Sequence, residues 1–288
     1  MNKLENRVKG ALYAFAIGDA MGAATEFMDR DQIHEAYGTV TDIIGGGWLN
    51  LPAGEVTDDT QMMICVYEGM KGQQLQQNAY GYIDTLDSIC KQFRAWADTN
   101  PPDIGGACLR AIYGTDGCDA FEWMQANVQR QEAANYEDLG NGGLMRCLVP
   151  ALIGNSDLAA DQAMLTHTND MTKECVRNYA VILRCALCYD YIPGRSWPHH
   201  FTPTGHVVNT LHNAVYWFAQ SYGVETAVVS AVNDGGDADT IAALTGGLAG
   251  AHYGYSNIPK RWVRQLNPAI REKLDEITQY ILEQYANE

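Results

Sequence analysis

Positive charge is scarce in this sequence. The 288 residues include 19 lysines and arginines against 35 aspartates and glutamates, which gives a formal net charge of -16. Such a chain offers no broad electrostatic attraction to nucleic acid or to an anionic membrane. We therefore expect no nucleic-acid partner. An anionic ligand would need a local source of positive charge, such as metal ions or helix N-termini.

Long apolar runs are also missing. No segment approaches the roughly 18–20 consecutive apolar residues that span a bilayer. The apolar stretch near the N-terminus is interrupted by Asp19 and is followed by no small-x-small cleavage pattern. This stretch predicts a first core helix, and the whole chain predicts a protein without a membrane span.

Cysteine is too sparse for a disulfide framework. The eight cysteines are scattered, and most lie in apolar helical patterns. The one Cys-x-x-Cys pair, Cys185 and Cys188, has no second pair at zinc-ribbon spacing. This usage favours reduced thiols, so we expect a cytoplasmic protein.

Apolar residues recur with the period of a helix along nearly the whole chain, whereas the alternation typical of strands is hard to find. The pattern predicts helices over residues 8–24, 60–70, 82–99, 172–192, 207–221, 224–234, 240–254 and 270–288. Residues 39–48 could hold a short strand. Clusters of Gly, Pro, Asn and Asp separate the helices, one of them at 193–205, and no linker divides the chain. The sequence therefore predicts one all-α domain over residues 1–288.

Two acidic segments, "VTDDTQ" and "NDGGDADT", stand immediately before helical patterns. Their oxygen-bearing residues are Thr57, Asp58 and Asp59 in the first segment and Asp237, Asp239 and Thr240 in the second. Helix capping explains either segment alone, and Asp58 with Gln61 fits a capping box. A cap needs only one acceptor, however, and Gly235 and Gly236 leave room for a ligand beside the second segment.

Carboxylate and hydroxyl oxygens are the ligands that hard cations such as Mg²⁺ prefer. Taken together, the two acidic segments predict the two halves of one metal site, with two ions roughly 3.5–4 Å apart. Such ions would supply the positive charge that the chain otherwise lacks.

Other carboxylates have simpler interpretations. Composition alone favours Asp19 as a polar residue inside the core and Glu26 as a surface group at a helix end. Asp103 precedes a helix that starts near Gly105, so it could be a helix cap.

The remaining polar motifs are weaker. The turn "LGNGG" at residues 139–143 has amides that suit a phosphate, but a single glycine-rich turn is a weak signal. His167 ends an apolar helix, where the helix dipole favours a histidine. Four further histidines are expected in a solvated loop, and they are His199, His200, His206 and His212.

Four motifs in combination resemble the ADP-ribosylglycohydrolase family. They are "GALYAFAIGDAMGAATEF", "TDDTQM", "GNGGLMR" and "NDGGDADTIAALTGGLAGAHYG", and the resemblance runs from about Val8 to Trp262. "NPPDIGGACLRAI", "THTND" and "GHVVNTL" are more similar to the dinitrogenase-reductase-activating branch than to the serine-directed branch. The resemblance implies a compact, orthogonal, all-α multi-helix fold with two Mg²⁺ or Mn²⁺ ions.

The resemblance also implies roles for individual residues. The metal ligands would be Thr57, Asp58, Asp59, Asp237, Asp239 and Thr240. Glu26 matches an acidic position near the metal, and Asp103 matches the carboxylate proposed as general base. Positions expected to contact the substrate are Gly105, Asn141, Gly142, His167, His206, Gly235 and Gly236.

Departures from the family pattern concern the substrate side. The family usually has threonine at Ala238, often Ser, Ala or Asn at Gly143, and a histidine or proline after His167. His206 and Asn209 stand where the family would place Tyr and Asp. The expected metal ligands are all present.

The function implied by the resemblance is hydrolysis of the N-glycosidic bond between ADP-ribose and a protein arginine. Asp103 or Glu26 would deprotonate the attacking water or assist opening of the sugar ring, and His206 or a nearby Tyr could stack on the adenine. The partners would be an ADP-ribosylated protein as substrate and free ADP-ribose as product, with the enzyme a monomer. Alternatives are a serine, nucleobase or O-acetyl-ADP-ribose linkage, a protein that blocks an ADP-ribosylating toxin, and a phosphohydrolase that releases AMP.

Overall fold

The computed structural model describes residues 1–73, 75, 82–194 and 199–286, and within them the regular structure is helical. The two β-bridges among these residues are isolated and join Gly46 with Leu51 and Gly140 with His206. The helices are α1 (Lys3–Gly22), α2 (Arg30–Tyr37), α3 (Asp58–Met70), α4 (Ile83–Ala97), α5 (Gly106–Ile112), α6 (Ala120–Ala134), α7 (Leu148–Leu152), α8 (Ser156–Met164), α9 (Asp170–Tyr189), α10 (Val207–Gln220), α11 (Val224–Val232), α12 (Ala238–Tyr253), the 3₁₀ turn η1 (Tyr255–Asn257), α13 (Lys260–Gln265) and α14 (Pro268–Ala286).

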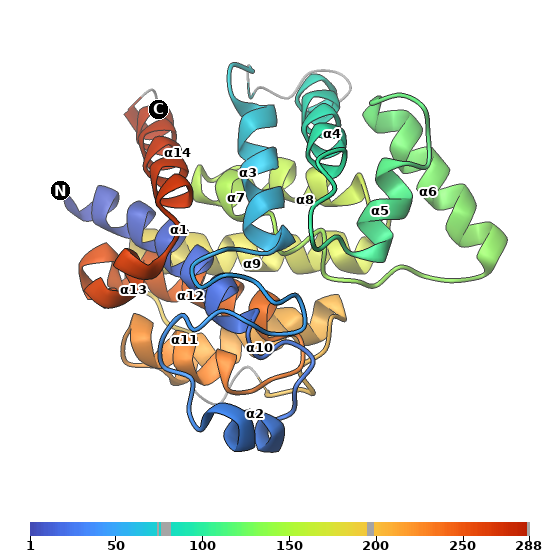
Figure 1. Ribbon diagram of the computed structural model, residues 1–288. Coiled ribbons are helices and arrows are strands. Elements are labelled where there is room, and N and C mark those ends of the chain that lie inside the picture. Colours follow the sequence, from blue (N-terminus) through green and yellow to red (C-terminus); the bar gives the residue numbers. More distant parts are fainter. Residues whose placement is uncertain (74, 76–81, 195–198, 287–288) are drawn as a thin grey trace.

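Helices α1 and α12 cross at the centre of the molecule in close contact (Figure 1). Glycines make this approach possible. A Cβ atom on Gly18 would lie 2.2 Å from the carbonyl oxygen of Ala242, and one on Gly246 would lie 2.1 Å from that of Ala14. At the far end a Cβ on Gly22 would lie 2.4 Å from the Cα of Asp239. The C-terminus of α1 is therefore fixed against the N-terminus of α12.

Helix α3 begins beside this crossing because Asp19 of α1 caps it. The Asp19 carboxylate is fully buried and accepts hydrogen bonds from the amides of Thr57, at 2.9 Å, and Thr60, at 3.0 Å. The structure confirms Asp19 as a polar core residue. It corrects the capping box expected for Asp58 and Gln61, since Thr57 is the N-cap and the Gln61 amide donates to the carbonyl of Val56.

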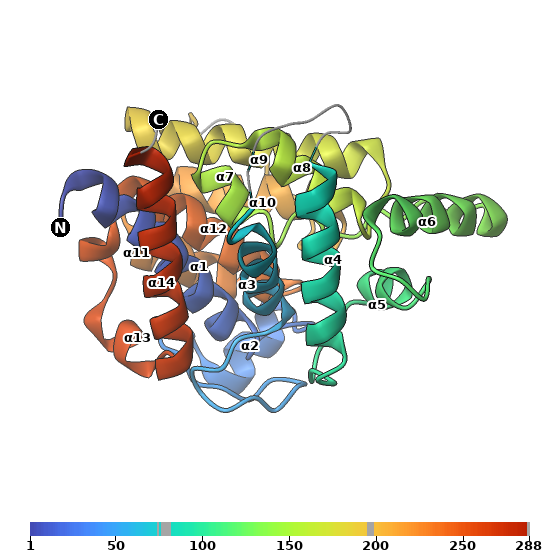
Figure 2. The same cartoon turned by 90° about the horizontal axis from the view of Figure 1, so that it is seen from above.

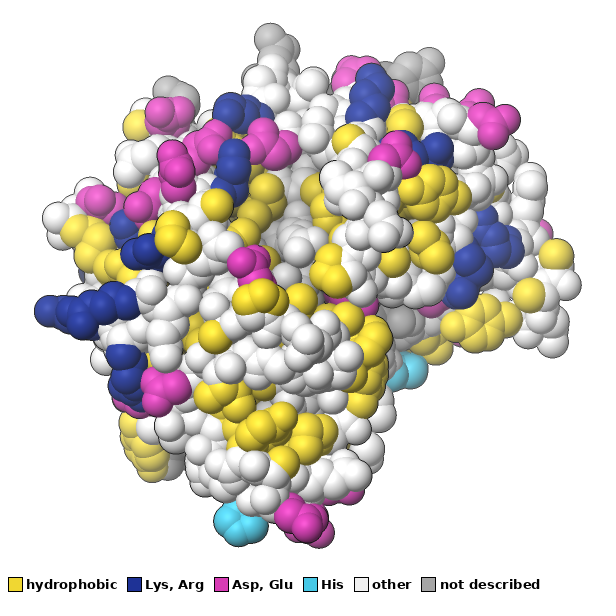
Figure 3. Space-filling model, viewed as in Figure 1, with side chains coloured by type: hydrophobic (Ala, Val, Ile, Leu, Met, Phe, Trp, Pro, Cys, Tyr) yellow, Lys and Arg dark blue, Asp and Glu magenta, His cyan; other side chains and the backbone are white. Residues whose placement is uncertain are grey.

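The other helices surround these three. Helices α9, α10 and α11 pack beside α12, and α14 packs beside α1. Figure 2 shows α6 projecting from the body of the molecule, with α5 between it and α4. On the face in Figure 3, acidic and basic side chains are interspersed and form no continuous basic surface. Lys273 of α14, for example, pairs with Glu68 of α3 at 2.7 Å.

The structure confirms the all-α fold class. The short strand expected at residues 39–48 is wrong, because that segment contributes only the isolated bridge at Gly46. Helices α2, α6 and α13 were not predicted from the apolar pattern. Parts of two predicted segments, the loop at 193–205 and the helix ending at 288, lie outside the described residues. Among the described helices, none combines the length and the apolar character that crossing a membrane requires.

Candidate metal centre and substrate cavity

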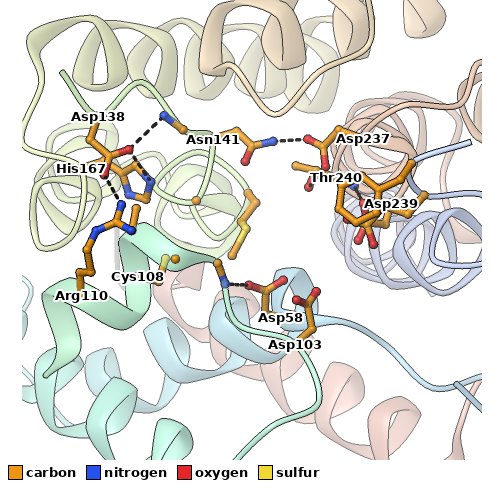
Figure 4. A pocket seen from close by; sticks show the side chains of 18 of the residues that line it. Asp58, Asp103, Cys108, Arg110, Asp138, Asn141, His167, Asp237, Asp239 and Thr240 are labelled. Atoms are coloured by element: carbon orange, nitrogen blue, oxygen red, sulfur yellow. Dashed lines mark hydrogen bonds and ion pairs between the residues drawn. The ribbon is translucent and has the colours of Figure 1, made fainter. Parts of the chain in front are cut away.

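A cavity of about 410 Å³ opens where the starts of α3, α5 and α12 meet the segment after α1 and the loop before α7. One end of the cavity is lined by carboxylates and the other by nitrogen donors (Figure 4). The carboxylates at the first end belong to Glu26, Asp58, Asp103, Asp237 and Asp239. The nitrogen donors at the other end belong to Arg110, Asn141 and His167, and one further carboxylate, Asp138, lies among them.

The two acidic segments are joined by hydrogen bonds at the carboxylate end. Asp59 Oδ2 accepts from the hydroxyls of Thr57 and Thr240, each at 3.2 Å, so that one carboxylate bridges the starts of α3 and α12. Asp58 Oδ2 accepts from the amide of Gly105 at 3.1 Å. Asp237 accepts from the side-chain amide of Asn141 and from Thr240. The two helix starts therefore form one cluster.

The electrostatics of this cluster are unfavourable without a cation. Burial raises the pKa of Asp58, Asp59 and Asp239 well above the usual value, and the neighbouring carboxylates raise it further. Burial also raises the pKa of Asp237 to about 6. Among the described residues that line the cavity, Arg110 is the one Lys or Arg, and Figure 4 shows it at the opposite end.

A divalent cation fits this donor set. Asp59 Oδ1 is buried and has no hydrogen-bond partner, which is costly for a carboxylate unless a cation is bound. Carboxylate and hydroxyl oxygens are the donors that Mg²⁺ and Mn²⁺ prefer. The carboxylates that could share an ion include Glu26, Asp103 and Asp239, each of which has an oxygen within 4.8 Å of the other two.

Glu26 lies inside the site and not on the surface, which corrects the expectation from composition. Its side chain is only 8 % exposed, and its Oε2 accepts from the indole Nε1–H of Trp48 at 2.5 Å. Burial raises the pKa of Glu26 to about 8, against the hydrogen bond from Trp48, and the charges of Asp237 and Asp103 add to the rise. Trp48 comes from the loop between α2 and α3, so tertiary contacts enclose a residue that the local pattern places at a helix end.

Asp103 is not a helix cap. The N-cap of α5 is Gly105, which has no side chain to cap with. Asp103 instead faces the cavity beside Asp58, and burial raises the pKa of its carboxyl group. The two residues expected to act on water, Glu26 and Asp103, are therefore neighbours.

The expected substrate-contacting residues divide into two groups. Gly105, Asn141, Gly142 and His167 line the cavity. Two backbone amides of the turn at residues 139–143, which we expected to be free for a phosphate, instead bond within the protein. The Gly140 amide donates to Asp138 at 3.4 Å, and the Asn141 amide donates to the carbonyl of Gly205 at 3.0 Å.

Gly235, Gly236 and His206 are not among the residues that line this cavity. A Cβ on Gly235 would lie 2.2 Å from the carbonyl oxygen of Met28, and one on Gly236 would lie 1.8 Å from that of Pro203. Backbone atoms fill the space beside these glycines. The expectation that a ligand has room there is therefore wrong. The ring of His206 caps α10 by accepting from the amide of Val208.

The histidines expected in a solvated loop are also partly corrected. His200 Nε2 lies 2.7 Å from Oδ2 of the buried Asp234. The indole of Trp217 donates to the same oxygen, and Arg30 donates to Oδ1. His212 lies in α10.

Sequence reasoning missed several cavity residues. Arg110 and Asp138 form an ion pair at 3.6 Å, and His167 Nε2 lies 3.9 Å from Asp138. Phe27 and Trp48 form an exposed aromatic pair, with ring centroids 5.5 Å apart. Phe27 has a left-handed φ of 64°, an unusual conformation for a bulky residue and one that clusters at functional sites. The available signals in the sequence were a cation in α5, Arg110, and two aromatic residues outside the helices, Phe27 and Trp48.

Comparisons with known proteins agree with this arrangement. The profile of the family described as ADP-ribosylglycohydrolase matches residues 1–191 and 186–288. The ADP-ribosyl-[dinitrogen reductase] glycohydrolase of Rhodospirillum rubrum is 30% identical, with 94% of each chain covered. The ADP-ribosylarginine hydrolase Tri1 of Pseudomonas putida is 29% identical, over 91% of this chain and 74% of its own.

A solved structure gives the same result at the level of the fold. A chain of an "ADP-ribosylglycohydrolase-related protein complex" superimposes with a TM-score of 0.73 and 27% identity, covering 99% of both chains. The matched profile, the relatives over nearly the full length and the shared fold all lead to one conclusion: this chain belongs to the ADP-ribosylglycohydrolase family.

Proposed function

We propose that this protein is a hydrolase that uses Mg²⁺ or Mn²⁺ to release ADP-ribose from ADP-ribosylated arginine side chains of proteins. The observation that carries the proposal is that Glu26, Asp103 and carboxylates from both acidic helix starts converge in one cavity. Asp58, Asp237, Asp239 and Thr240 line the cavity, and Thr57 and Asp59 are buried behind them in the same hydrogen-bonded cluster. The relatives from R. rubrum and P. putida support the class of reaction, and the second of them, by its name, supports the arginine linkage.

The residues proposed to hold two cations are those of the two helix starts, Thr57, Asp58, Asp59, Asp237, Asp239 and Thr240. When bound, the cations would supply Lewis-acid chemistry to the ribose hydroxyls and to a water molecule. The protein fixes the donors in advance, because the hydrogen bonds of Asp59 to Thr57 and Thr240 hold the two helix starts together.

Asp103 or Glu26 then accepts a proton from the attacking water. The water oxygen forms a bond to the anomeric carbon of the ribose as the bond from that carbon to the guanidine nitrogen breaks. The departing guanidine receives the proton held by the carboxylate and leaves as guanidinium, because its pKa is above about 12. The carboxylates around the anomeric carbon stabilise the positive charge that develops there.

The mouth of the cavity suits a guanidinium leaving group. Phe27 and Trp48 are 68% and 55% exposed and stand next to Glu26, and both line the cavity. Aromatic faces attract guanidinium groups, as do carboxylates. The donor end, with Asn141 and His167, is then left for the nucleotide part of the substrate.

The test is release of free ADP-ribose from an arginine-ADP-ribosylated protein, with Mg²⁺, with Mn²⁺ and with EDTA. Parallel reactions contain a serine-linked substrate and O-acetyl-ADP-ribose. We expect metal-dependent release of intact ADP-ribose from the arginine linkage, at the highest kcat/KM of the three.

Other outcomes would change the proposal in distinct ways. Faster release from serine or from O-acetyl-ADP-ribose would keep the reaction class and replace the linkage. Formation of AMP would indicate a phosphohydrolase. Protection of a target protein by variants that have lost the proposed metal ligands would indicate a binding role without catalysis.

A further inference from the structure

Arg146 is buried in the core behind the cavity. Its side chain has no exposed surface, and among the described residues no carboxylate lies within ion-pair distance of it. The guanidinium stacks on Phe93, 4.5 Å from the ring centroid, and burial lowers its pKa. A buried cation without an ion pair is costly, so its hydrogen-bond partners are informative.

Two of these partners connect Arg146 to the cavity wall. Arg146 Nε donates to Gln162 Oε1 at 2.7 Å, and the Gln162 amide donates to the carbonyl of Gly143 at 2.9 Å. Arg146 Nη2 donates to the hydroxyl oxygen of Thr166 at 2.8 Å. Thr166 Oγ1 lies 2.8 Å from His167 Nδ1. A continuous path therefore leads from Arg146 through Thr166 to His167.

The protons along this path can be placed. Guanidinium nitrogens only donate, so Thr166 Oγ1 is the acceptor toward Arg146 and keeps its own hydrogen free to donate. His167 Nδ1 lies 2.8 Å from Oγ1 and, when it carries no proton, is a strong acceptor for that hydrogen. The Cys108 sulfur also lies near Thr166, but a thiol is a weak acceptor.

We propose that Arg146 is a positioning residue, which acts through Thr166 to hold His167 in the tautomer that carries its proton on Nε2. The ring then presents an N–H donor to the donor end of the cavity, where the carboxylate of Asp138 lies 3.9 Å from Nε2. Gly140 and Gly142 leave space for this edge of the ring. A Cβ on Gly140 would lie 3.1 Å from Nε2, and one on Gly142 would lie 3.3 Å from it.

A neutral ring is consistent with the surroundings. Burial, together with the charges of Arg146 and Arg110, lowers the pKa of His167 to about 3. His167 therefore carries one ring proton near neutral pH, and its position decides whether Nε2 donates or accepts. The acceptor for Nε2–H would be a hydroxyl or phosphate oxygen of the ligand. This consequence for binding rests on the proposed function, whereas the tautomer does not.

The first test is the tautomer itself. Two-bond ¹H–¹⁵N correlation spectra of the uniformly ¹⁵N-labelled, metal-free protein distinguish protonated from unprotonated ring nitrogens. The signals of His167 are identified by their absence in His167→Gln. We expect Nδ1 to be unprotonated and Nε2 to carry the proton. A proton on Nδ1 in the wild-type protein would overturn the proposal without any variant.

The second test removes the Thr166 hydroxyl. Thr166→Val keeps the side-chain shape, and we expect a mixture of the two His167 tautomers. Thr166→Ser restores the hydroxyl and should restore the Nε2–H tautomer. Thr172→Val is the matched control, because the buried Thr172 hydroxyl has no hydrogen-bond partner. Substitutions of Arg146 are expected to unfold the protein, so Thr166 is the informative position.

Binding and turnover complete the test. For Thr166→Val we expect ADP-ribose to bind about 3- to 10-fold more weakly, the effect of losing one ordered hydrogen bond. KM should rise with kcat little changed, because His167 lies away from the carboxylate end. An unchanged tautomer in Thr166→Val would reject the role of the path. A wild-type protein with the Nε2–H tautomer but no hydrolase activity would reject the proposed function and keep this inference.

Discussion

Asp58 shows at the scale of one residue how stability and metal binding oppose each other. It is buried beside Asp103, and its Oδ2 accepts from the amide of Gly105. Asn at this position would keep an acceptor for that amide and would offer an N–H to Asp103. The negative charge that repels its neighbours would be removed.

We therefore expect Asp58→Asn to raise the Tm of the metal-free protein at pH 8 and to lose most of the Tm gain that Mg²⁺ gives the wild type. Turnover should fall by about 10²-fold or more, as expected when a metal site is disturbed. Thermal unfolding with and without Mg²⁺, together with kcat/KM, measures both effects. The control is Asp170→Asn, an exposed aspartate in the first turn of α9. A lower Tm of metal-free Asp58→Asn would contradict the electrostatic account.

Phe27 illustrates strain at a single position. Its left-handed φ of 64° suits glycine and disfavours a bulky side chain. We expect Phe27→Gly to keep the Tm within a few degrees of the wild type, because relief of strain of about 1 kcal/mol offsets the lost ring contact with Trp48.

The KM for an arginine-linked protein should nevertheless rise with Phe27→Gly, while binding of free ADP-ribose is unchanged. Steady-state kinetics and titration calorimetry separate the two quantities. Weaker binding of free ADP-ribose in this variant would place Phe27 on the nucleotide side of the cavity instead.

At the scale of elements, the crossing of α1 and α12 determines where the two acidic segments meet. Backbone fills the space beside Gly18, and a Cβ there would lie 2.2 Å from Ala242 O. We expect Gly18→Ala to destabilise the protein by about 3 kcal/mol or more, since neither helix backbone can move away without moving the site.

Chemical denaturation measures the free energy of unfolding of Gly18→Ala. Gly194→Ala is the control: a Cβ on Gly194 has no atoms within 4 Å and the backbone there is not left-handed, so little change in the free energy of unfolding is expected. Equal losses in the two variants would show that the α1–α12 contact is less close than described.

Helices with a regular apolar pattern in their own sequence could be predicted. The burial of the site could not be predicted, because it depends on contacts between segments far apart in the chain. The small residues of α12 and the acidic residues before it are adjacent in the sequence, so the helix and the candidate ligands were both visible. The burial of Glu26 depends on Trp48, which comes from a separate loop. The filling of the space beside Gly235 and Gly236 depends on Met28 and Pro203, which no pattern near those glycines indicates.

At the scale of the whole molecule, stability should depend on pH and on metal together. The pKa of Glu26 rises from 4.5 to about 8 on folding, and that of Asp237 from 3.8 to about 6. Between these limits the folded state binds more protons than the unfolded state, so stability falls as pH rises. We expect the Tm of the metal-free protein to fall between pH 5 and pH 8.

Metal ions should reverse this trend, because they bind the deprotonated carboxylates and compete with protons. The Tm gain from Mg²⁺ is therefore expected to be larger at pH 8 than at pH 5.5. Thermal unfolding across this pH range, with EDTA and with excess Mg²⁺, checks the sign. A metal-induced gain that is larger at pH 5.5 would contradict the assignment of these carboxylates.

The most direct measurement is a calorimetric titration of EDTA-treated protein with Mn²⁺, for the wild type, Asp58→Asn and Asp237→Asn. If the two helix starts form one metal centre, the wild type binds two equivalents of Mn²⁺ and both variants lose tight binding. No binding by the wild type, or undiminished binding by both variants, would contradict it.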